Sequence, residues 1–391
     1  MNVLPRLISR SIREYTGYFP VVYLGGPRQS GKTTLLRHLF PDYPYASLEN
    51  PDTRLLAEQD PRRFLATFPK GAILDEIQRT PALFSYLQGL VDDHTGLRFI
   101  LSGSQNFLLM EKITQSLAGR VGILTLLPFG LEELPLEISG SMSPEQWAWQ
   151  GGYPALYDRQ LPPPIAFPSY VETYLQRDVR QMRNIGDLNH FSRFLRLCAG
   201  RVGQVLNLSS LANDADISVN TVKAWLSILE ASYLVFFLQP YHRNFNKRLI
   251  KSPKLYFFDT GLLCSLLGID EQAQLHTHYM YGNIMENMLL AELYKRRSHR
   301  GGRPAFWFWR DSNGNEVDLL VEEGGVLQAI ELKASKTYNT RLFSGLTWWQ
   351  KNAGQSPAHS HLIYLGDQYI ETAQGTLVPW KKAVLEKWGE R

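Results

Sequence analysis

Residues 26 to 34 read Gly26-Pro27-Arg28-Gln29-Ser30-Gly31-Lys32-Thr33-Thr34 and match the full phosphate-binding pattern G-x-x-x-x-G-K-T. The apolar run at residues 21–24 predicts a buried strand before the pattern, and the apolar spacing at 34–40 predicts a helix after it. The alternative is a glycine-containing turn that binds nothing. Because the full pattern and its strand–loop–helix context agree, they favour a phosphate site, to which all nine residues would contribute.

The residue types in this pattern explain how it would bind ATP. Gly26 and Gly31 allow the backbone N–H groups to turn inward around the phosphates, where a Cβ would obstruct them. Lys32 would reach the β- and γ-phosphates, and the hydroxyl of Thr33 would contact Mg²⁺. The positive end of the following helix favours the bound anion. We therefore expect ATP and Mg²⁺ as cofactors.

A second motif adds a hydrolytic function. Residues 71–76 form an apolar run that ends in Asp75 and Glu76, so two carboxylates are expected at the exit of another buried strand. Asp75 can then hold the Mg²⁺ shell, and Glu76 can orient and deprotonate the attacking water. The two motifs together predict hydrolysis of ATP in addition to binding.

Composition is typical of a folded globular protein. The 391 residues are 44% hydrophobic and 20% charged, with a net charge of +4 and two cysteines. The length predicts two or three domains, and two cysteines in apolar helical stretches predict neither disulfides nor a cysteine metal site. No run approaches the roughly 18 apolar residues of a membrane span, and the first residues lack an apolar signal core. We expect a cytoplasmic protein with no membrane partner.

Three domains are predicted along the chain. Residues 1–160 alternate strand and helix signals, which is typical of an α/β parallel sheet with a P-loop. The prolines at 162–164 suggest a linker or a stiff turn. Residues 161–275 contain two helical stretches, 206–212 and 217–230, followed by apolar runs at 233–238 and 255–258 that could form a wing, so a winged helix-turn-helix is expected. Residues 276–391 predict a helix, a hairpin around Asn313-Gly314 and further strands.

The last of these domains holds a second candidate site. Glu331 and Lys333 lie two apart on a predicted strand and so share one face; Asp318 lies on the preceding strand and Glu286 on the helix before it. Such carboxylates can bind Mg²⁺ while the lysine positions or activates a water for phosphodiester cleavage. The alternative is a solvated Glu-x-Lys pair on an exposed strand, which is commonplace.

Together these motifs resemble a known family. The phosphate loop, the residues GAILDEIQ at 71–78, LSGSQN at 101–106 and LAGR at 117–120 are similar to those of prokaryotic AAA-type ATPases whose C-terminal domain has a restriction-endonuclease-like core. The resemblance implies that Ser104, or else Gln105 or Asn106, senses the γ-phosphate. It also implies that Arg120 is an arginine finger for a neighbouring subunit, with a purely structural arginine as the alternative. A finger in trans requires a homo-oligomer, with a hexamer as one candidate.

The C-terminal residues are similar to the PD-(D/E)XK nuclease superfamily, in which Glu286, Asp318, Glu331 and Lys333 match the motif positions. Val317 stands where the name-giving proline would be. No second sensor arginine motif is evident after the ATPase core. The resemblance thus implies Glu286, Asp318 and Glu331 as metal ligands and Glu331 and Lys333 as catalytic groups.

DNA is the expected partner. The predicted recognition helix carries only Lys223 as a basic residue, but residues 242–254 and 295–303 are rich in cations. Charge runs can also be solvated surface. The leading hypothesis is an oligomeric ATPase that binds, remodels or cleaves DNA. The alternative is a nucleotide-driven switch that binds protein partners and retains a degenerate nuclease-like domain.

Overall fold

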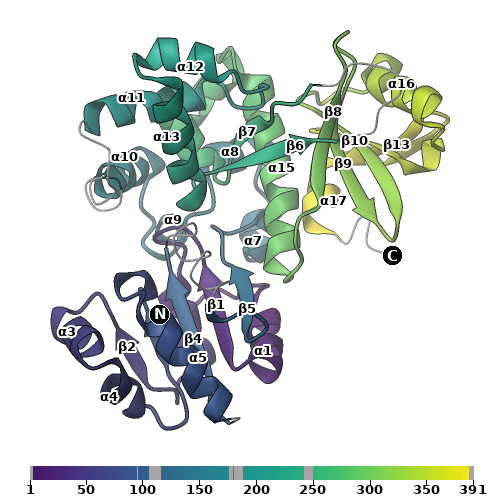
Figure 1. Cartoon of the computed structure of the whole chain (residues 1–391). Helices are drawn as coiled ribbons and strands as arrows, with labels where there is room; N and C mark the ends of the chain where they lie inside the picture. Colours follow the sequence, from purple (N-terminus) through teal and green to yellow (C-terminus); the bar gives the residue numbers. More distant parts are fainter. Residues whose placement is uncertain are drawn as a thin grey trace. The chain divides into compact units, whose positions relative to one another are not determined.

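The computed structural model describes residues 3–94, 96–104, 116–175, 179, 188–241 and 250–386 (Figure 1). The chain forms two compact units. The first unit contains Met1–Phe129 together with two short later segments, Ala231–Leu234 and Arg297–Arg303. The second unit contains Gly130–Glu230, Val235–Arg296 and Pro304–Arg391. Within the described residues, no helix combines the length and the apolar character that crossing a membrane requires.

The first unit is built on a five-stranded parallel sheet with the order β2-β3-β4-β1-β5 (Figure 1). Its strands are β1 (Val21–Gly25), β2 (Tyr45–Ser47), β3 (Ile73–Asp75), β4 (Phe99–Gly103) and β5 (Val121–Thr125). Its helices are α1 (Ser9–Tyr18), α2 (Lys32–Leu39), α3 (Pro51–Gln59), α4 (Pro61–Ala66), the 3-10 turn η1 (Ile77–Arg79) and α5 (Leu83–Asp93). The α/β parallel core and the strand–loop–helix around residue 26 are confirmed.

Burial explains why these segments are strands. Every residue of β1 and of β4 is buried, because hydrophobic clusters lie on both faces of the sheet. Val21 and Tyr23 contribute to one cluster, and Val22 and Leu24 to the other. This alternation is what a continuous apolar run gives in a parallel sheet that is covered on both sides.

The second unit begins with short helices and ends with an eight-stranded mixed sheet. Its helical elements are η2 (Leu131–Glu133), α7 (Leu136–Ser139), α8 (Pro144–Gln150), α9 (Ala155–Asp158), α10 (Pro163–Tyr174), α11 (Leu188–Ala199), α12 (Leu208–Ala215), α13 (Val219–Ala231), α14 (Thr260–Leu266), η4 (Gln272–Thr277), α15 (Tyr281–His299), η5 (Thr340–Phe343), α16 (Ser344–Ala353), η6 (Pro357–His359) and α17 (Trp380–Leu385). The strands are β6 (Val235–Pro240), β7 (Lys254–Phe257), β8 (Phe306–Arg310), β9 (Glu316–Glu323), β10 (Val326–Lys333), β11 (Ser360–Tyr364), β12 (Ile370–Thr372) and β13 (Gly375–Pro379).

The strand order is β12-β13-β11-β10-β9-β8-β6-β7, so one sheet crosses the predicted boundary between residues 275 and 276. The expected wing strands, β6 and β7, pair with each other in antiparallel fashion. In addition, β6 pairs in parallel with β8, through Gln239 and Trp307. The described parts of 161–275 and 276–391 therefore share one sheet, and the three-domain division stays a prediction.

Two local predictions can be compared directly with the structure. The hairpin is confirmed, because β8 and β9 are antiparallel neighbours and Gly314 has φ +86° in the turn between them. The prediction of a linker or a stiff turn at residues 162–164 is wrong, because Pro163 and Pro164 are helical. Pro162 is the N-cap of α10, which starts at Pro163. A proline at the first helical position loses no hydrogen bond and has a suitable φ, so a proline run can start a helix.

Candidate functional site

The phosphate loop joins β1 to α2 in a conformation that only glycine can adopt at two points. Gly31 precedes α2 with φ +91°, in the left-handed region. A Cβ at Gly26 would lie 2.1 Å from the carbonyl oxygen of Leu126, so no side chain fits there. The loop backbone is therefore packed closely against the segment that follows β5.

Arg6 and Ser30 fix the loop from within. The Arg6 guanidinium donates to the carbonyl of Ser30 at 3.0 Å and to that of Leu127 at 2.7 Å. Ser30 is fully buried, and its Oγ has no hydrogen-bond partner among the residues that the structure describes. A buried hydroxyl without a partner is uncommon. It fits a loop that accommodates phosphate oxygens.

Lys32 is held over the loop. Its side chain is buried, and Nζ donates to the carbonyls of Gly26 at 2.9 Å and of Pro27 at 2.8 Å. A buried ammonium needs acceptors, and here the loop itself supplies them. The one cation of the pattern therefore lies beside the glycine that begins it.

Asp75 ends β3 in a network of donors. One carboxylate oxygen accepts from Thr33 Oγ1 at 2.7 Å and from the Tyr45 hydroxyl at 2.9 Å. The other accepts from Ser102 Oγ and from the N–H of Glu76. Partial burial, followed by the charge of Asp75, raises the pKa of Tyr45 to about 12. Asp75 is thus fixed beside Thr33, the arrangement expected of two groups that share a magnesium ion.

Glu76 follows in a left-handed conformation, φ +57° and ψ +41°. Its Oε2 accepts from Gln78 Nε2, which also donates to Ser104 Oγ at 3.2 Å. Burial raises the pKa of Glu76, while the nearby charges of Lys32 and Arg28 oppose the shift. A carboxylate with a raised pKa, oriented by a neighbour, has the properties of a general base.

Ser104 is therefore linked to Glu76 through Gln78, whereas Arg120 lies elsewhere. The backbone carbonyl of Arg120 accepts from the N–H of Val21, at the start of β1 and not at the loop. Its guanidinium pairs with Asp92 through contacts of 2.5 and 2.8 Å, which raises the pKa of Arg120. The alternative sensors, Gln105 and Asn106, lie outside the described residues.

Four residues of this site were missed by the sequence analysis: Arg6, Tyr45, Gln78 and Ser102. Gln78 and Ser102 lie inside motifs that had been singled out, so polar residues at the carboxyl ends of strands were an available signal. Arg6 and Tyr45 carry no such signal, because their contacts arise only when distant segments fold together.

Three residues of the second predicted site, Asp318 on β9 and Glu331 and Lys333 on β10, also lie close to one another. Lys333 Nζ lies 2.5 Å from Glu331 Oε1 and 3.6 Å from Asp318 Oδ2, and Asp318 also accepts from the N–H of Leu332 at 2.9 Å. Burial, followed by the charge of Asp318, raises the pKa of Glu331 to about 8, although Lys333 opposes the shift. Glu331 Oε2 is buried, and no described residue forms a hydrogen bond with it.

The raised pKa of Glu331 predicts a pH-dependent stability of the second unit. The folded state holds the Glu331 proton more tightly than the unfolded chain does. The contribution of this proton to the free energy of unfolding is therefore complete below pH 4.5 and is lost as the pH rises to about 8. The limiting slope is about 1.4 kcal/mol per pH unit. Glu331→Gln should therefore flatten the decline in unfolding free energy between pH 6 and 8. Urea titrations followed by tryptophan fluorescence suit this test, since every tryptophan lies at residue 147 or later.

Exposed Glu322, on the neighbouring strand β9, provides the control, Glu322→Gln, which should leave the pH dependence unchanged. Equal slopes for wild type and Glu331→Gln would show that Glu331 titrates in its ordinary range.

Glu286 belongs to the same region but contacts other residues. Its Oε1 accepts from the Tyr256 hydroxyl at 2.6 Å and lies 3.4 Å from Lys254 Nζ. Lys254 is 3% exposed and also pairs with Glu316, which in turn pairs with Arg310 at 3.2 Å. Burial raises the pKa of Glu286, and Lys254 opposes the shift. Lys254, Tyr256 and Glu316 were not anticipated from the sequence.

Within the residues that the structure describes, no three His, Cys, Asp or Glu side chains are grouped so as to hold a metal ion. In the carboxylate–lysine cluster, which we define as Lys254, Glu286, Glu316, Asp318, Glu331 and Lys333, two ammonium groups lie among four carboxylates. The residues predicted as ligands thus lie in one region, each with a cation as a neighbour.

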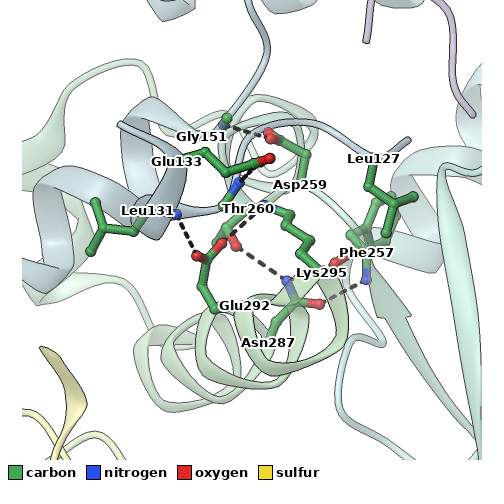
Figure 2. Close-up of polar contacts among 12 residues, drawn as sticks. Leu127, Leu131, Glu133, Gly151, Phe257, Asp259, Thr260, Asn287, Glu292 and Lys295 are labelled. Atoms are coloured by element: carbon green, nitrogen blue, oxygen red, sulfur yellow. Dashed lines mark hydrogen bonds and ion pairs between the residues drawn. The ribbon is translucent and has the colours of Figure 1, made fainter. Parts of the chain in front are cut away.

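The predicted basic surface at 295–303 is wrong for its first two residues. Lys295 is 2% exposed and pairs with Glu292 at 3.0 Å, while Arg296 is 8% exposed and donates to the carbonyl of Ala383. Figure 2 shows Lys295 and Glu292 in an internal network in which Glu292 accepts from the N–H of Leu131. These cations are neutralised inside the unit.

The remaining parts of that network tie loops to helices (Figure 2). Asp259 accepts from the N–H groups of Gly152 and Leu262, and the amide of Asn287 bonds both backbone groups of Phe257. Burial raises the pKa of Asp259, and Lys295 opposes the shift. Of the other basic stretch, residues 242–249 lie outside the described residues, and Lys254 is buried.

Comparisons with known proteins agree with the first site. An AAA domain model matches residues 18–135, and models of two domains of unknown function, DUF8612 and DUF4143, match 143–273 and 281–383. The Walker-type ATPase paby2304 of Pyrococcus abyssi is a similar solved structure, at 18% identity and a TM-score of 0.46, covering 68% of this chain and 96% of that one.

Two curated relatives are much closer in sequence. The uncharacterized proteins Mb2031c of Mycobacterium bovis and Rv2008c of Mycobacterium tuberculosis are each 32% identical over 324 residues, which is 81% of this chain and 71% of theirs. The chain carries an AAA-type ATPase domain on the residues that form its phosphate loop and its two strand-end carboxylates. It therefore belongs to the family of AAA-type ATPases that includes these mycobacterial proteins.

Proposed function

We propose that this protein hydrolyses ATP with Mg²⁺ and uses the turnover to act on DNA as a homo-oligomer. The observation that carries the hydrolytic part is the placement of Glu76, with its raised pKa, directly after Asp75 and within hydrogen-bonding reach of Gln78. Thr33 and Asp75 would hold the magnesium ion, which neutralises phosphate charge when bound. Lys32 binds phosphate, Glu76 takes the proton from water, and Ser104 senses the phosphate through Gln78.

Arg120 supports the oligomer. It lies immediately before β5, five residues before Thr125, which pairs with Gly25 of β1, so its backbone lies about 16 Å from the level of Gly25. Its guanidinium pairs with Asp92, so a role in hydrolysis would be toward a neighbour's nucleotide, and a purely structural arginine is the alternative. Light scattering with and without ATP would test the assembly: a monomer under both conditions would contradict this role.

A groove on the second unit supports a polyanionic partner. It is lined by Thr340, Arg341, Ser344, Thr347, Trp348, Lys351 and Gln374. Arg341 and Lys351 are exposed, and within the described residues neither is in an ion pair. Trp348 stacks on Trp309, with ring centroids 4.8 Å apart. Cations beside an aromatic ring and hydroxyl groups are suited to a nucleic-acid backbone and its bases.

Helix α16, which contributes Ser344, Thr347, Trp348 and Lys351 to the groove, also approaches the carboxylate–lysine cluster. A Cβ at Gly345, in the first turn of α16, would be 3.1 Å from Glu331 Oε2 and 2.8 Å from the carbonyl of Glu316. A strand of DNA in the groove would thus pass close to Glu331. We propose that the second unit combines a winged helix with a PD-(D/E)XK-like domain, in which Glu286, Asp318 and Glu331 bind Mg²⁺ and Lys333 activates water.

DNA coupling is tested by ATP turnover with duplex, single-stranded and branched DNA. Wild type should be stimulated, whereas Arg341→Ala with Lys351→Ala should lose the stimulation and keep its basal rate. Arg62→Ala changes an exposed cation of the first unit and serves as the control. If no DNA substrate changes the rate, the coupling is absent.

Nuclease activity gives a separate prediction. With Mg²⁺ or Mn²⁺ the wild type should nick or cut DNA, and Asp318→Ala and Lys333→Ala should each reduce cleavage by at least about 10²-fold, since each removes a group that acts on the phosphodiester. The exposed neighbour variant Glu322→Ala should cleave normally. Cleavage that survives both active-site changes would place the activity elsewhere.

One observation favours a second function. The buried ammonium of Lys254 already contacts Glu286 and Glu316, so part of the cluster is neutralised without a metal ion. On this ground the second unit would be a degenerate nuclease-like domain, and ATP would switch its binding to protein partners. ATP-dependent assembly together with no DNA affinity at low salt, where phosphate contacts are strongest, would favour the switch.

A further inference from the structure

Tyr233 lies at the base of the phosphate loop although it is about 200 residues away in sequence. The segment Ala231–Leu234, which follows α13, belongs to the first unit. A Cβ at Gly25 would lie 2.4 Å from the Tyr233 hydroxyl oxygen and 3.3 Å from its Cζ atom. The tyrosine hydroxyl therefore occupies the space that a side chain at the last residue of β1 would need.

The backbone of Tyr233 is also unusual. Its φ is +56°, in the left-handed region that tyrosine rarely adopts. Five non-glycine residues of the described chain have positive φ, and three of them surround the phosphate loop: Gln29 within it, Glu76 after β3, and Tyr233. Residues held in such conformations cluster at active sites and switch regions.

Electrostatic coupling places the same groups near one another. Tyr23, on β1, is fully buried, and burial raises its pKa, with further contributions from Tyr233 and then Glu76. The ring of Tyr23 also approaches the Gly25 position, at 3.1 Å from the Cβ site. Tyr23 thus lies near Tyr233, near Glu76 and near the last residue of β1.

A helix C-terminus often ends in a left-handed residue, so the φ value alone would indicate only a cap at the end of α13. Glycine or asparagine is the usual residue at such a position, however, and tyrosine is strained there. The close approach of the hydroxyl to Gly25 is a feature that a cap does not require. The two observations together point to a role at the loop.

We propose that Tyr233 is a positioning residue for ATP hydrolysis. Its hydroxyl supports the Gly25–Gly26 junction, and the segment Ala231–Leu234 thereby responds to the state of the phosphate loop. The chain continues from this segment into α13 on one side and β6 on the other. A change in this segment on ATP binding would therefore be transmitted along the chain to α13 and β6, which are proposed to belong to a winged helix.

The first test is a double-mutant cycle on ATP turnover. Gly25→Ala should lower kcat/KM by about tenfold or more, because the new Cβ displaces the loop, and small displacements of this kind are costly in catalysis. Tyr233→Phe removes only the oxygen atom and should lower kcat modestly. The double variant should recover to the level of Tyr233→Phe. Gly89→Ala, at an exposed helix position with no atom within 4 Å of its Cβ, is the control.

The second test separates positioning from mere packing. In wild type, AMP-PNP should slow hydrogen exchange in residues 231–240, and in Tyr233→Phe this response should be lost while the thermal midpoint is kept. Lys32→Ala should show no response. If Gly25→Ala does not fold, the exchange result decides alone. Additive effects in the cycle, or a wild-type exchange response in Tyr233→Phe, would overturn the proposal. Neither test contains DNA, so its outcome is independent of the proposed DNA function.

Discussion

Glu76→Gln is expected to lower kcat for ATP about 10²–10⁴-fold while ATP affinity is retained, because an amide cannot accept the proton of the attacking water. Glutamine has the same length and can still contact Gln78, which bonds Glu76 Oε2. The loss should therefore fall on the chemical step and leave the fold of the loop intact. Phosphate release measures kcat, and calorimetry measures the affinity.

The pH dependence of the same reaction gives an internal check. Burial raises the pKa of Glu76, and a general base works only when ionised. Turnover by the wild type should thus fall as the pH drops through the raised pKa of Glu76. The residual turnover of Glu76→Gln should not show this fall at low pH. Glu58→Gln, at an exposed position on α3, should behave as wild type. Near-normal turnover by Glu76→Gln would assign the base to another residue.

The sequence predicted the first site well because its chemistry is local. Lys32 and Thr33 follow a strand within one motif, and Asp75 and Glu76 end another strand. In a parallel sheet, the carboxyl ends of the strands meet at one edge. Adjacent motifs in such a sheet therefore imply adjacent side chains, even without coordinates.

Contacts that join distant segments could not be predicted in this way. Arg6 supports the loop from the N-terminus, and Tyr233 approaches Gly25 from the turn after α13. Neither residue has a spacing or a neighbour in sequence that indicates a phosphate site. Their positions depend on how the helices pack, which local periodicity does not determine.

Charge was the least reliable signal. The cations at residues 295 and 296 were predicted to lie on the surface. Lys295 instead pairs with Glu292, one helical turn earlier, and both side chains are buried. Lys254 is likewise buried between Glu286 and Glu316. A sequence gives the sign of a charge, but whether it is exposed depends on the partners that folding brings to it.

Lys32→Ala is expected to abolish measurable ATP binding. The Lys32 ammonium is buried over the loop, and its removal takes away the donor to the carbonyls of Gly26 and Pro27. Wild type at an ATP concentration of 100 Kd should gain about 2.7 kcal/mol of stability. In calorimetric melts the variant should therefore lack the ATP-dependent rise in Tm, whereas Lys70→Ala, at an exposed position, should keep it.

The same variant separates the two sites. The proposed DNA cleavage by the carboxylate–lysine cluster would use Asp318 and Lys333 and no nucleotide, so Lys32→Ala should still cut DNA. Loss of cleavage in Lys32→Ala, with the second unit folded by tryptophan fluorescence, would instead show that ATP gates the cluster. An ATP-dependent rise in Tm in Lys32→Ala would contradict the assignment of the phosphate loop, on which both functions depend.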